Sequence, residues 1–255
     1  MGAPDFPRDA FALNLLAFDT STEVLTVAAR AGDAGEVHEF AGAGGAESSA
    51  TLLPAIHDVL ARAGLSLRSL DAICFGCGPG SFTGLRTACA VAQGLGFGAA
   101  LPVLPVDTLT LVAESARAAT GETRVVAVLD ARMGDVYVAQ AEWDGAAWAV
   151  TAPALCRPEA VLVPAGWALA GNAFMAHGAS LPKGPLRIDA FPTAAALLRI
   201  APALLTAGHA VPAVRAAPLY VRDKVAQTTD ERAADRARKD AALAAAGPSG
   251  VRGKP

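Results

Sequence analysis

The sequence predicts an α/β fold in two related lobes, each a mixed sheet with flanking helices. Two apolar runs carry this prediction, one ending at Asp19 and a second, much further along the chain, ending at Asp130. Each run is followed by a short turn and another apolar run, which is the pattern of a β-hairpin. The recurrence indicates two related lobes, although two unrelated hairpins would give the same pattern.

The composition excludes several classes of function. Apolar residues make up 53% of the 255 residues and charged residues 18%, so the chain has enough apolar surface to offset the entropy cost of folding. The net charge of −3 gives no basic field for nucleic acid, and aromatic residues, at 5%, provide few rings on which bases could stack. If RNA is involved, we expect another protein to hold it.

The cysteines and histidines predict neither a disulfide scaffold nor a metal site. Four cysteines are too few for such a scaffold, and the single C-x-x-C of Cys74 and Cys77 has no second pair to complete a zinc pattern. None of the four histidines forms an H-x-x-x-H pair. With no signal peptide, acylation motif or membrane-length apolar run apparent, we expect a cytoplasmic protein.

The first lobe is predicted over residues 1–113. Proline is tolerated in the first turn of a helix, so Pro54 predicts that the first helix begins near Ser49–Thr51, and Gly64 can end it. Thr108 can cap the third helix. The predicted elements are strands at 13–18, 24–29, 72–75 and 101–106 and helices at about 49–63, 81–98 and 109–119.

The second lobe is predicted over 114–229. Trp143 and Trp148 bracket a turn. Pro202 should kink or end the last helix of this lobe. This helix can pack either within its own lobe or back against the first lobe. Residues 230–255 are rich in charge, Ala, Gly and Pro, which predicts an exposed helix that frays into a disordered end. The predicted elements are strands at 125–129, 136–138, 162–163 and 167–170 and a helix at 193–205.

A glycine-rich segment at 76–84 connects a predicted strand to a predicted helix. Backbone N–H groups at such a helix start can bind an anion. The segment nevertheless lacks the lysine of a P-loop, the third glycine of a dinucleotide fingerprint and the G-x-S-x-G elbow. The alternative is a tight turn with Ser81 or Thr83 as the helix N-cap. The helix start could also lower the pKa of the Cys77 thiol, but no histidine is adjacent in sequence to make this cysteine a nucleophile.

Asp19 and Asp130 have two open interpretations. In two-lobed phosphotransferases, acidic residues at strand ends hold a metal–nucleotide complex; alternatively, each aspartate caps its own turn. No glycine follows Asp19 to let a phosphate approach the backbone, so we expect ATP or ADP to bind weakly at most, and no cofactor to be required. We find no catalytic constellation. The candidate nucleotide or anion ligands are Asp19, Ser21, Gly78, Gly80, Ser81 and Asp130.

The helix after the glycine-rich segment has unusually small side chains. Gly94, Gly96 and Gly98 each cost about 1 kcal/mol relative to alanine inside a helix. Close approach of another backbone is the simplest explanation for this loss. The neighbour is either a helix of the same chain or one of a partner chain.

Several segments, in this order, resemble the bacterial TsaB (YeaZ) family over about residues 13–229. The GPGSFTG and DARMGDVY sequences are together highly specific. The segments are LAFDTST at 16–22, Leu53-Pro54, GPGSFTGLR at 78–86, QGL at 93–95, DARMGDVY at 130–137, and PLYVR at 218–222 with KVA at 224–226.

The resemblance implies the two-lobed actin/hexokinase-like fold and a role as a partner rather than as an enzyme. Members of the family help to form N6-threonylcarbamoyladenosine at position 37 of tRNAs that read ANN codons. The paralogue TsaD carries metal-binding histidines and transfers the threonylcarbamoyl group. TsaB docks on TsaD, and the ATPase TsaE engages the pair, so that tRNA is met only through the complex.

The resemblance also places the docking surface on the helices at 49–63 and 81–98, which the isolated chain can use to form a homodimer. Two positions depart from the family pattern. Ser48 stands where members often have histidine, and Cys77 stands where many have arginine. The residues expected to form the docking surface are Leu52, Ile56, Arg86, Ala90 and Gly94.

A second class of function stays open at this point. It is a small-molecule kinase or ATPase of the same fold that uses Asp19, Asp130 and the glycine-rich segment. A protease is disfavoured, because the sequence offers neither a Ser/His/Asp arrangement nor a metal cluster. Titration with Mg-ATP distinguishes the kinase from a non-catalytic partner.

Overall fold

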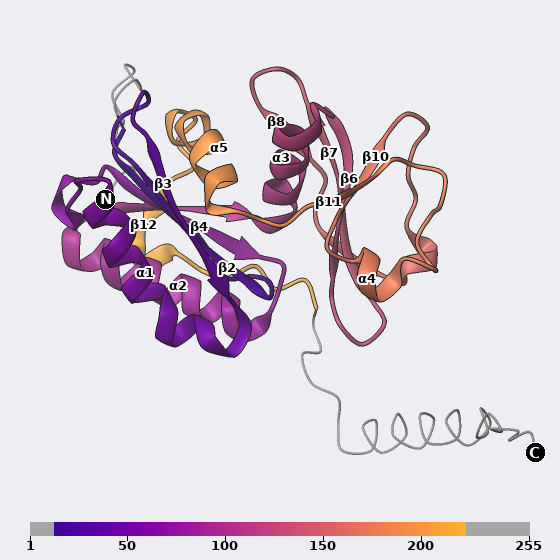
Figure 1. Cartoon of the computed structure of the whole chain (residues 1–255), viewed down its shortest axis with the longest axis horizontal. Coiled ribbons are helices and arrows are strands. Elements are labelled where there is room, and N and C mark those ends of the chain that lie inside the picture. Colours follow the sequence, from indigo (N-terminus) through magenta and orange to yellow (C-terminus); the bar gives the residue numbers. More distant parts are fainter. Residues whose placement is uncertain (1–12, 223–255) are drawn as a thin grey trace, which may run out of the picture. The chain divides into compact units, whose positions relative to one another are not determined.

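The computed structural model describes residues 13–222, which form two mixed β-sheets with flanking helices (Figure 1). This arrangement confirms the predicted fold class. The first sheet has the strand order β12-β5-β4-β1-β2-β3, and the second has the order β11-β10-β6-β7-β8, with β9 paired to β7. The strands are Leu15–Asp19 (β1), Val24–Arg30 (β2), Val37–Ala43 (β3), Ala72–Gly78 (β4), Pro102–Asp107 (β5), Arg124–Asp130 (β6), Val136–Trp143 (β7), Trp148–Val150 (β8), Ala154–Cys156 (β9), Ala168–Gly171 (β10), Arg187–Asp189 (β11) and Val211–Pro212 (β12).

The two sheets repeat one topology. In the first sheet, β1, β2 and β3 form an antiparallel meander, while β4 and β5 extend the sheet in parallel from the other side of β1. In the second sheet, β6, β7 and β8 form the meander, while β10 and β11 extend it in parallel from β6. The hairpins β1–β2 and β6–β7 therefore occupy equivalent places, as the sequence repeat predicted.

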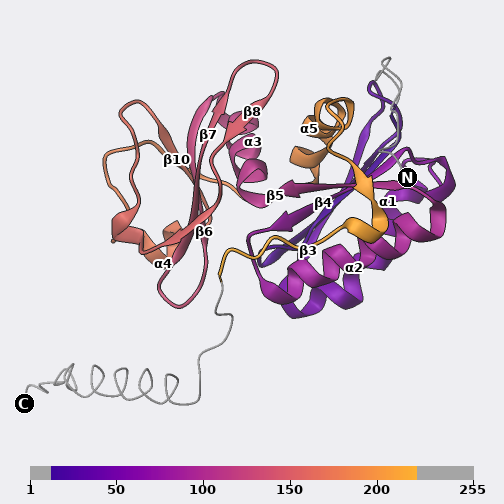
Figure 2. The ribbon, with the colours of Figure 1, turned by 180° about the vertical axis from the view of Figure 1, so that it is seen from behind.

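Helices cover both faces of the first sheet (Figure 2). Helices α1 and α2 pack on one face, against Leu16 and Phe18, and α5 packs on the other, against Leu15 and Ala17. The first four residues of β1 are apolar because each face of the strand is covered. Helix α3 packs on the second sheet, against strands that include Leu129. The helices are Ser48–Arg62 (α1), Phe82–Ala99 (α2), Thr108–Thr120 (α3), Phe174–His177 (α4) and Ala194–Thr206 (α5).

The first sheet receives elements from late in the sequence. Helix α5 covers one of its faces, and β12 pairs with β5 at its edge. The predicted boundary between 113 and 114 falls inside α3. The predicted tail at 230–255 lies outside the described residues. Among residues 13–222, no helix combines the length and the apolar content that a membrane span requires.

Two predictions about helices were wrong, and one of the two outcomes predicted at Pro202 does not occur. Helix α1 begins at Ser48, so Pro54 lies in its second turn rather than its first. Helix α3 is capped by the Asp107 carboxylate and not by Thr108. Helix α5 continues through Pro202 to its last residues instead of ending there. Its interior is held by burial against the first sheet, which outweighs the hydrogen bond that a proline removes.

Two predictions about strands also differ from the structure. Strand β3 was not predicted, because it lies at a sheet edge and its side chains alternate only between exposed and half-buried. Such a strand lacks the apolar alternation by which strands are recognised. Residues 162–163, predicted as a strand, have no regular structure, and Leu162 is 79% exposed.

Candidate functional site

The glycine-rich segment folds against the β1–β2 turn. The backbone N–H of Ser81 donates to the Ser21 carbonyl (2.7 Å), and the Thr20 hydroxyl donates to the Gly84 carbonyl (2.7 Å). A Cβ atom at Gly80 would lie 2.5 Å from the Ser21 carbonyl oxygen, and one at Gly84 would overlap the Thr20 carbonyl. These glycines are therefore needed for close contact between two segments of the same chain.

This contact encloses most of the predicted anion ligands. Thr20 and Ser21 are buried, and the Ser81 hydroxyl accepts from the Gly84 N–H at the start of α2, as expected for an N-cap. Gly78 has a φ of +122° and faces the backbone of Leu219. The structure thus brings the predicted ligands of the first lobe together, and contacts within the chain occupy the Ser81 N–H, the Ser21 hydroxyl and one oxygen of Asp19.

Asp19 is buried at the end of β1 with one oxygen unpaired. Its Oδ1 accepts from the backbone N–H (2.9 Å) and the hydroxyl (2.7 Å) of Ser21, whereas Oδ2 has no hydrogen-bond partner and lies against Gly76. Burial raises the pKa of Asp19 to about 6, and the hydrogen bonds from Ser21 only partly oppose this effect. Asp19 therefore caps its own turn, which is the second of the two interpretations given for it above.

Asp130 occupies the equivalent place in the second lobe and also caps its own turn. Its Oδ1 accepts from the Arg132 N–H (2.8 Å), and His177 Nε2 lies 3.0 Å from the same oxygen. Arg132 Nη1 lies 3.2 Å from Oδ2. Among residues 13–222, no three His, Cys, Asp or Glu side chains are grouped so that they could hold a metal ion.

Asn172 connects the two hairpin turns, and the sequence analysis missed it. Its Oδ1 accepts from the Asp130 N–H (3.0 Å), and its Nδ2 lies 3.3 Å from Oε2 of Glu23, the last residue of the β1–β2 turn. The preceding Gly171 has a φ of +150°, and a Cβ there would overlap the Val128 carbonyl. The Gly-Asn pair after a strand was the local signal of this unusual backbone.

The two departures from the family pattern are at a buried residue, Ser48, and a partly buried one, Cys77. Burial raises the pKa of the Cys77 thiol to about 12, so the lowering that the helix start could cause does not occur. Ser48 is fully buried, and its hydroxyl has no partner among the described residues. Neither residue offers a reactive group or an ion-pairing group at the surface. All four cysteines are free thiols.

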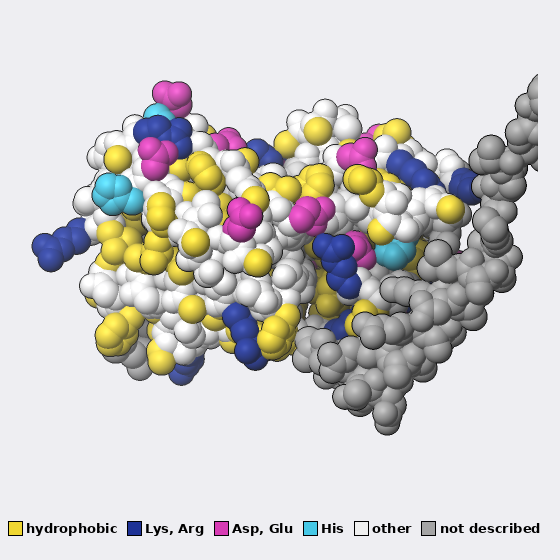
Figure 3. Space-filling view, turned by 60° about the horizontal axis from the view of Figure 1, so that its bottom comes forward, with side chains coloured by type: hydrophobic (Ala, Val, Ile, Leu, Met, Phe, Trp, Pro, Cys, Tyr) yellow, Lys and Arg dark blue, Asp and Glu magenta, His cyan; other side chains and the backbone are white. Residues whose placement is uncertain are grey.

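The expected docking residues divide between the core and the surface. Leu52 is completely buried and Ile56 is 4% exposed in the isolated chain, because their helical spacing turns both side chains toward the sheet. Arg86, Ala90 and Gly94 are exposed on α2. Figure 3 looks onto the side where α1 and α2 lie in Figure 1, and hydrophobic side chains gather there with few charged ones among them.

The α1–α2 face contains a shallow apolar groove of about 490 Å³. Ile56 lines this groove together with the 51% exposed Leu53 and with Leu95. The glycines of α2 serve two purposes. Cβ atoms at Gly94 and Gly98 would meet nothing within 4 Å, whereas one at Gly96 would lie 2.9 Å from Val103 and Ala213 side-chain atoms. The same chain therefore packs closely against Gly96, whereas the surface beside Gly94 and Gly98 is open, and a partner helix at that place stays a prediction.

An aromatic cluster continues this face at the start of α2. The Arg86 guanidinium lies 3.9 Å above the Phe82 ring, and its Nε donates to the Tyr220 hydroxyl (3.1 Å). The Phe82 and Tyr220 rings are 5.5 Å apart and both are partly exposed. Arginine and aromatic side chains of this kind are enriched at the energetic centres of protein interfaces.

Two lobes with the same strand order and with aspartate-capped hairpins at equivalent places define the actin/hexokinase-like class. Residues 44–251 match the family model described as "TsaD: tRNA N6-adenosine threonylcarbamoyltransferase". The chain belongs to the TsaB (YeaZ) family within this class. The family-model match runs into the tail beyond residue 229, which the sequence analysis had left outside the resemblance.

Two TsaB proteins and one solved structure match over almost their whole length. The chain is 35% identical to the tRNA threonylcarbamoyladenosine biosynthesis protein TsaB of Haemophilus influenzae, over 84% of this chain and 95% of that protein. It is 34% identical to the protein of the same name from Escherichia coli, over 84% and 96%. The crystal structure described as YeaZ from Pseudomonas aeruginosa is similar with a TM-score of 0.76 and 37% identity, over 82% and 99%.

Proposed function

We propose that this chain is a cytoplasmic, non-catalytic subunit of the machinery that forms N6-threonylcarbamoyladenosine at position 37 of tRNAs reading ANN codons. In this role it binds and activates a TsaD-type transferase. The observation that carries the proposal is the similarity to proteins named for this biosynthesis, matched over 95% and 96% of their lengths. A match of this extent favours a shared role over the reuse of one domain.

The occupied polar groups of the first lobe support a role through binding rather than chemistry. The Ser81 N–H, which an anion would need at the helix start, donates to the Ser21 carbonyl. The aspartates at both hairpins bind the backbones of their own turns. Activation then consists of binding the active shape of the transferase more tightly than its other shapes.

The exposed α1–α2 face supports a protein partner at this place. Leu53 and Phe97 are 51% and 83% exposed, and the open space beside Gly94 allows a partner backbone to approach closely. The Arg86 cluster supplies an anchor at one end of the face. In the isolated chain, the same face pairs two copies as a homodimer. A TsaE-type ATPase engages the assembled pair, and tRNA is bound only through the complex.

The test places bulk and charge on this face. Ala90 and Gly94 are exposed, and Gly94 has no neighbour within 4 Å, so the double substitution Ala90→Glu, Gly94→Leu leaves the isolated fold intact. We expect the variant to lose co-purification with the TsaD-type subunit. We also expect the modified adenosine in cellular tRNA to fall by about tenfold or more in cells that carry only the variant.

The matched control is Ala176→Glu, at an exposed position of α4 in the second lobe. This variant should keep both the complex and the modification. If the Ala90→Glu, Gly94→Leu variant still co-purifies with the TsaD-type subunit and supports the modification, the proposed docking surface is wrong. Unchanged modification in cells that lack the whole chain would overturn the function itself.

A further inference from the structure

A separate pocket of about 490 Å³ lies between β5, α3, α5 and the β7–β8 hairpin. Its volume falls in the range of small-molecule sites. Among residues 13–222, its lining has no member in common with the groove on the α1–α2 face, the glycine-rich segment or the Asp130 turn. The class of ligand that this pocket fits follows from the chemistry of its walls.

The walls of the pocket are mainly aliphatic. Strand β5 contributes Pro105 and Val106, helix α5 contributes Ile200 and Leu204, and β8 contributes Val150. Val106 and Ile200 are buried, whereas the other three are only half-buried. A ligand in the pocket would therefore cover apolar surface that water now contacts, and this burial favours binding of an apolar body.

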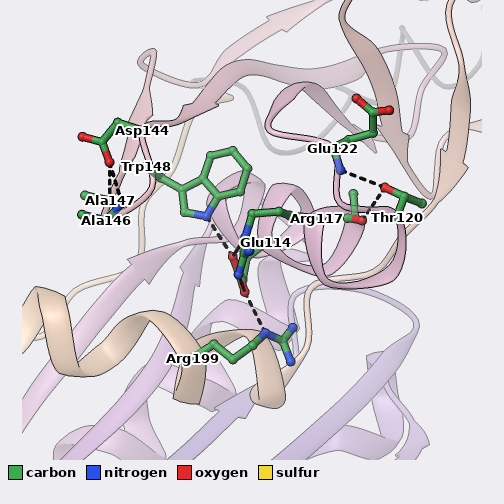
Figure 4. A network of polar contacts seen from close by, with 10 residues as sticks. Glu114, Arg117, Thr120, Glu122, Asp144, Ala146, Ala147, Trp148 and Arg199 are labelled. Carbon is green, nitrogen blue, oxygen red and sulfur yellow. Dashed lines mark hydrogen bonds and ion pairs between the residues drawn. The ribbon is translucent and has the colours of Figure 1, made fainter.

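Two tryptophans add aromatic surface to these walls. Trp143 and Trp148 both line the pocket, and their rings lie 5.5 Å apart. The Trp148 indole N–H donates to the buried Glu114 (3.0 Å), and the Arg117 guanidinium lies 4.7 Å from the centre of the Trp143 ring (Figure 4). Both rings are thus held in place before a ligand arrives. Flat aromatic molecules pack well against such rings.

The charged groups at the pocket are already balanced within the chain. Arg199 Nε donates to the buried Glu114 carboxylate at 2.7 Å, and Arg117 shares the same carboxylate. The Asp107 carboxylate accepts from two backbone N–H groups at the start of α3 (2.8 and 3.2 Å). The charges of the two arginines therefore offset those of the two acids. An ionic ligand would lose its hydration without gaining an uncompensated partner.

We propose that this pocket binds a small, flat, uncharged aromatic molecule. Its ring packs against Trp143 and Trp148, and its edges contact the aliphatic side chains of β5 and α5. Helix α5 covers the first sheet, and the β7–β8 hairpin belongs to the second, so the ligand contacts elements of both lobes. The site lies outside the proposed partner surface and does not depend on the proposed function.

The first test varies charge and flatness on one ring system. The probes are 2-naphthol, its saturated form decahydro-2-naphthol, the anion 2-naphthoate and the cation 2-naphthylmethylammonium. Calorimetry at neutral pH should give a Kd below about 1 mM for 2-naphthol, about tenfold or more weaker binding for both ions, and about threefold or more weaker binding for the saturated alcohol. If either ion binds as tightly as 2-naphthol, or the saturated alcohol does, the assigned ligand class is wrong.

The second test places the binding in the pocket. Titration with 2-naphthol should shift the indole N–H resonances of Trp143 and Trp148. Trp167, which is not part of the pocket lining, should stay unmoved and serves as the internal reference. Binding that leaves the resonances of both lining tryptophans in place would show that the probe binds elsewhere and would overturn the proposal.

A pair of variants completes the test. Ala203 lines the pocket at an exposed position of α5, so Ala203→Phe fills the space without disturbing the core. It should weaken the binding of 2-naphthol by about tenfold or more. The matched control, Ala119→Phe, adds the same ring at an exposed position of α3 outside the lining and should keep the Kd within about twofold. Equal binding by the two variants contradicts the assigned site.

Discussion

The Nε atom of Arg199 donates to Oε1 of Glu114 at 2.7 Å, and this contact joins α5 on the first sheet to α3 on the second. Glu114 is completely buried and also accepts from Arg117 Nε (2.9 Å), Arg117 Nη2 (3.0 Å) and the Trp148 indole (3.0 Å) (Figure 4). Burial alone would raise the pKa of Glu114, but these hydrogen bonds outweigh it and lower the pKa. The network therefore ties the lobes together through one ionised carboxylate.

Replacing Glu114 by Gln should lower the free energy of unfolding by about 1–3 kcal/mol. The glutamine amide is neutral, and its N–H groups are donors. Both neighbouring guanidinium groups, of Arg117 and Arg199, need acceptors instead. Urea denaturation measures the loss. The matched control is Glu142→Gln, because Glu142 faces Arg124 at 4.0 Å and both side chains are more than half exposed. That variant should differ from the wild type by less than about 0.5 kcal/mol.

The cost of Glu114→Gln should depend on pH. The pKa of Glu114 is lowered in the folded state, so its contribution is complete above the ordinary carboxyl pKa and is lost as the pH falls toward the lowered value. Unfolding curves at a series of acidic pH values should show the two proteins converging. If the difference in unfolding free energy between the wild type and Glu114→Gln stays constant into the acid range, the charge of Glu114 does not contribute to stability.

Asp19 should have the opposite pH dependence. The pKa of Asp19 is about 6 in the folded protein, whereas the ordinary value for an aspartate is 3.8. The folded state therefore binds the proton of Asp19 more tightly than the unfolded state does. The wild type therefore loses stability as the pH rises from about 4 to about 6, by about 1–3 kcal/mol. Asp19→Asn keeps an oxygen for Ser21 and does not titrate, so its stability relative to the wild type should rise over this interval. Parallel pH profiles for the two proteins would contradict the assignment.

Two glycines of α2 should respond oppositely to alanine. Gly84→Ala places a methyl group against the Thr20 carbonyl, which is backbone and cannot easily yield, so a loss of about 2–4 kcal/mol is expected. Gly94→Ala meets open space in the isolated chain and should stabilise it by about 0.5–1 kcal/mol through helix propensity. Thermal unfolding of both variants measures the contrast, and similar effects would show that α2 packs differently.

The hairpins and buried strands could be predicted because their apolar runs are continuous. Strand β1 is covered on both faces, and its aspartate marks the strand end in the sequence. Strand β3 could not be predicted in this way, since its exposed edge position leaves no apolar alternation. Helix α5 does not end at Pro202, because burial of the helix in the core outweighs the local preference of proline.

The candidate sites were predictable only in part, for a related reason. Helical spacing identified Leu52 and Ile56, but the same spacing marks the stripe that faces the core, where both side chains are buried. Glu114 and Asn172 make their key contacts with residues far away in the sequence, which no local pattern reveals. The glycine-rich segment was recognised, but its partner, the turn at Ser21, became evident only from the fold.

Nucleotide binding should be weak for a reason that can be tested. A phosphate at the start of α2 would have to displace the hydrogen bond from the Ser81 N–H to the Ser21 carbonyl and approach the unpaired Asp19 Oδ2, which repels anions when ionised. We therefore expect calorimetric titration of the isolated chain with Mg-ATP to give a Kd above about 100 μM, with no turnover of ATP. A Kd in the low micromolar range accompanied by steady hydrolysis would instead favour a kinase or ATPase that opens this contact, and Asp130→Asn should then abolish the turnover.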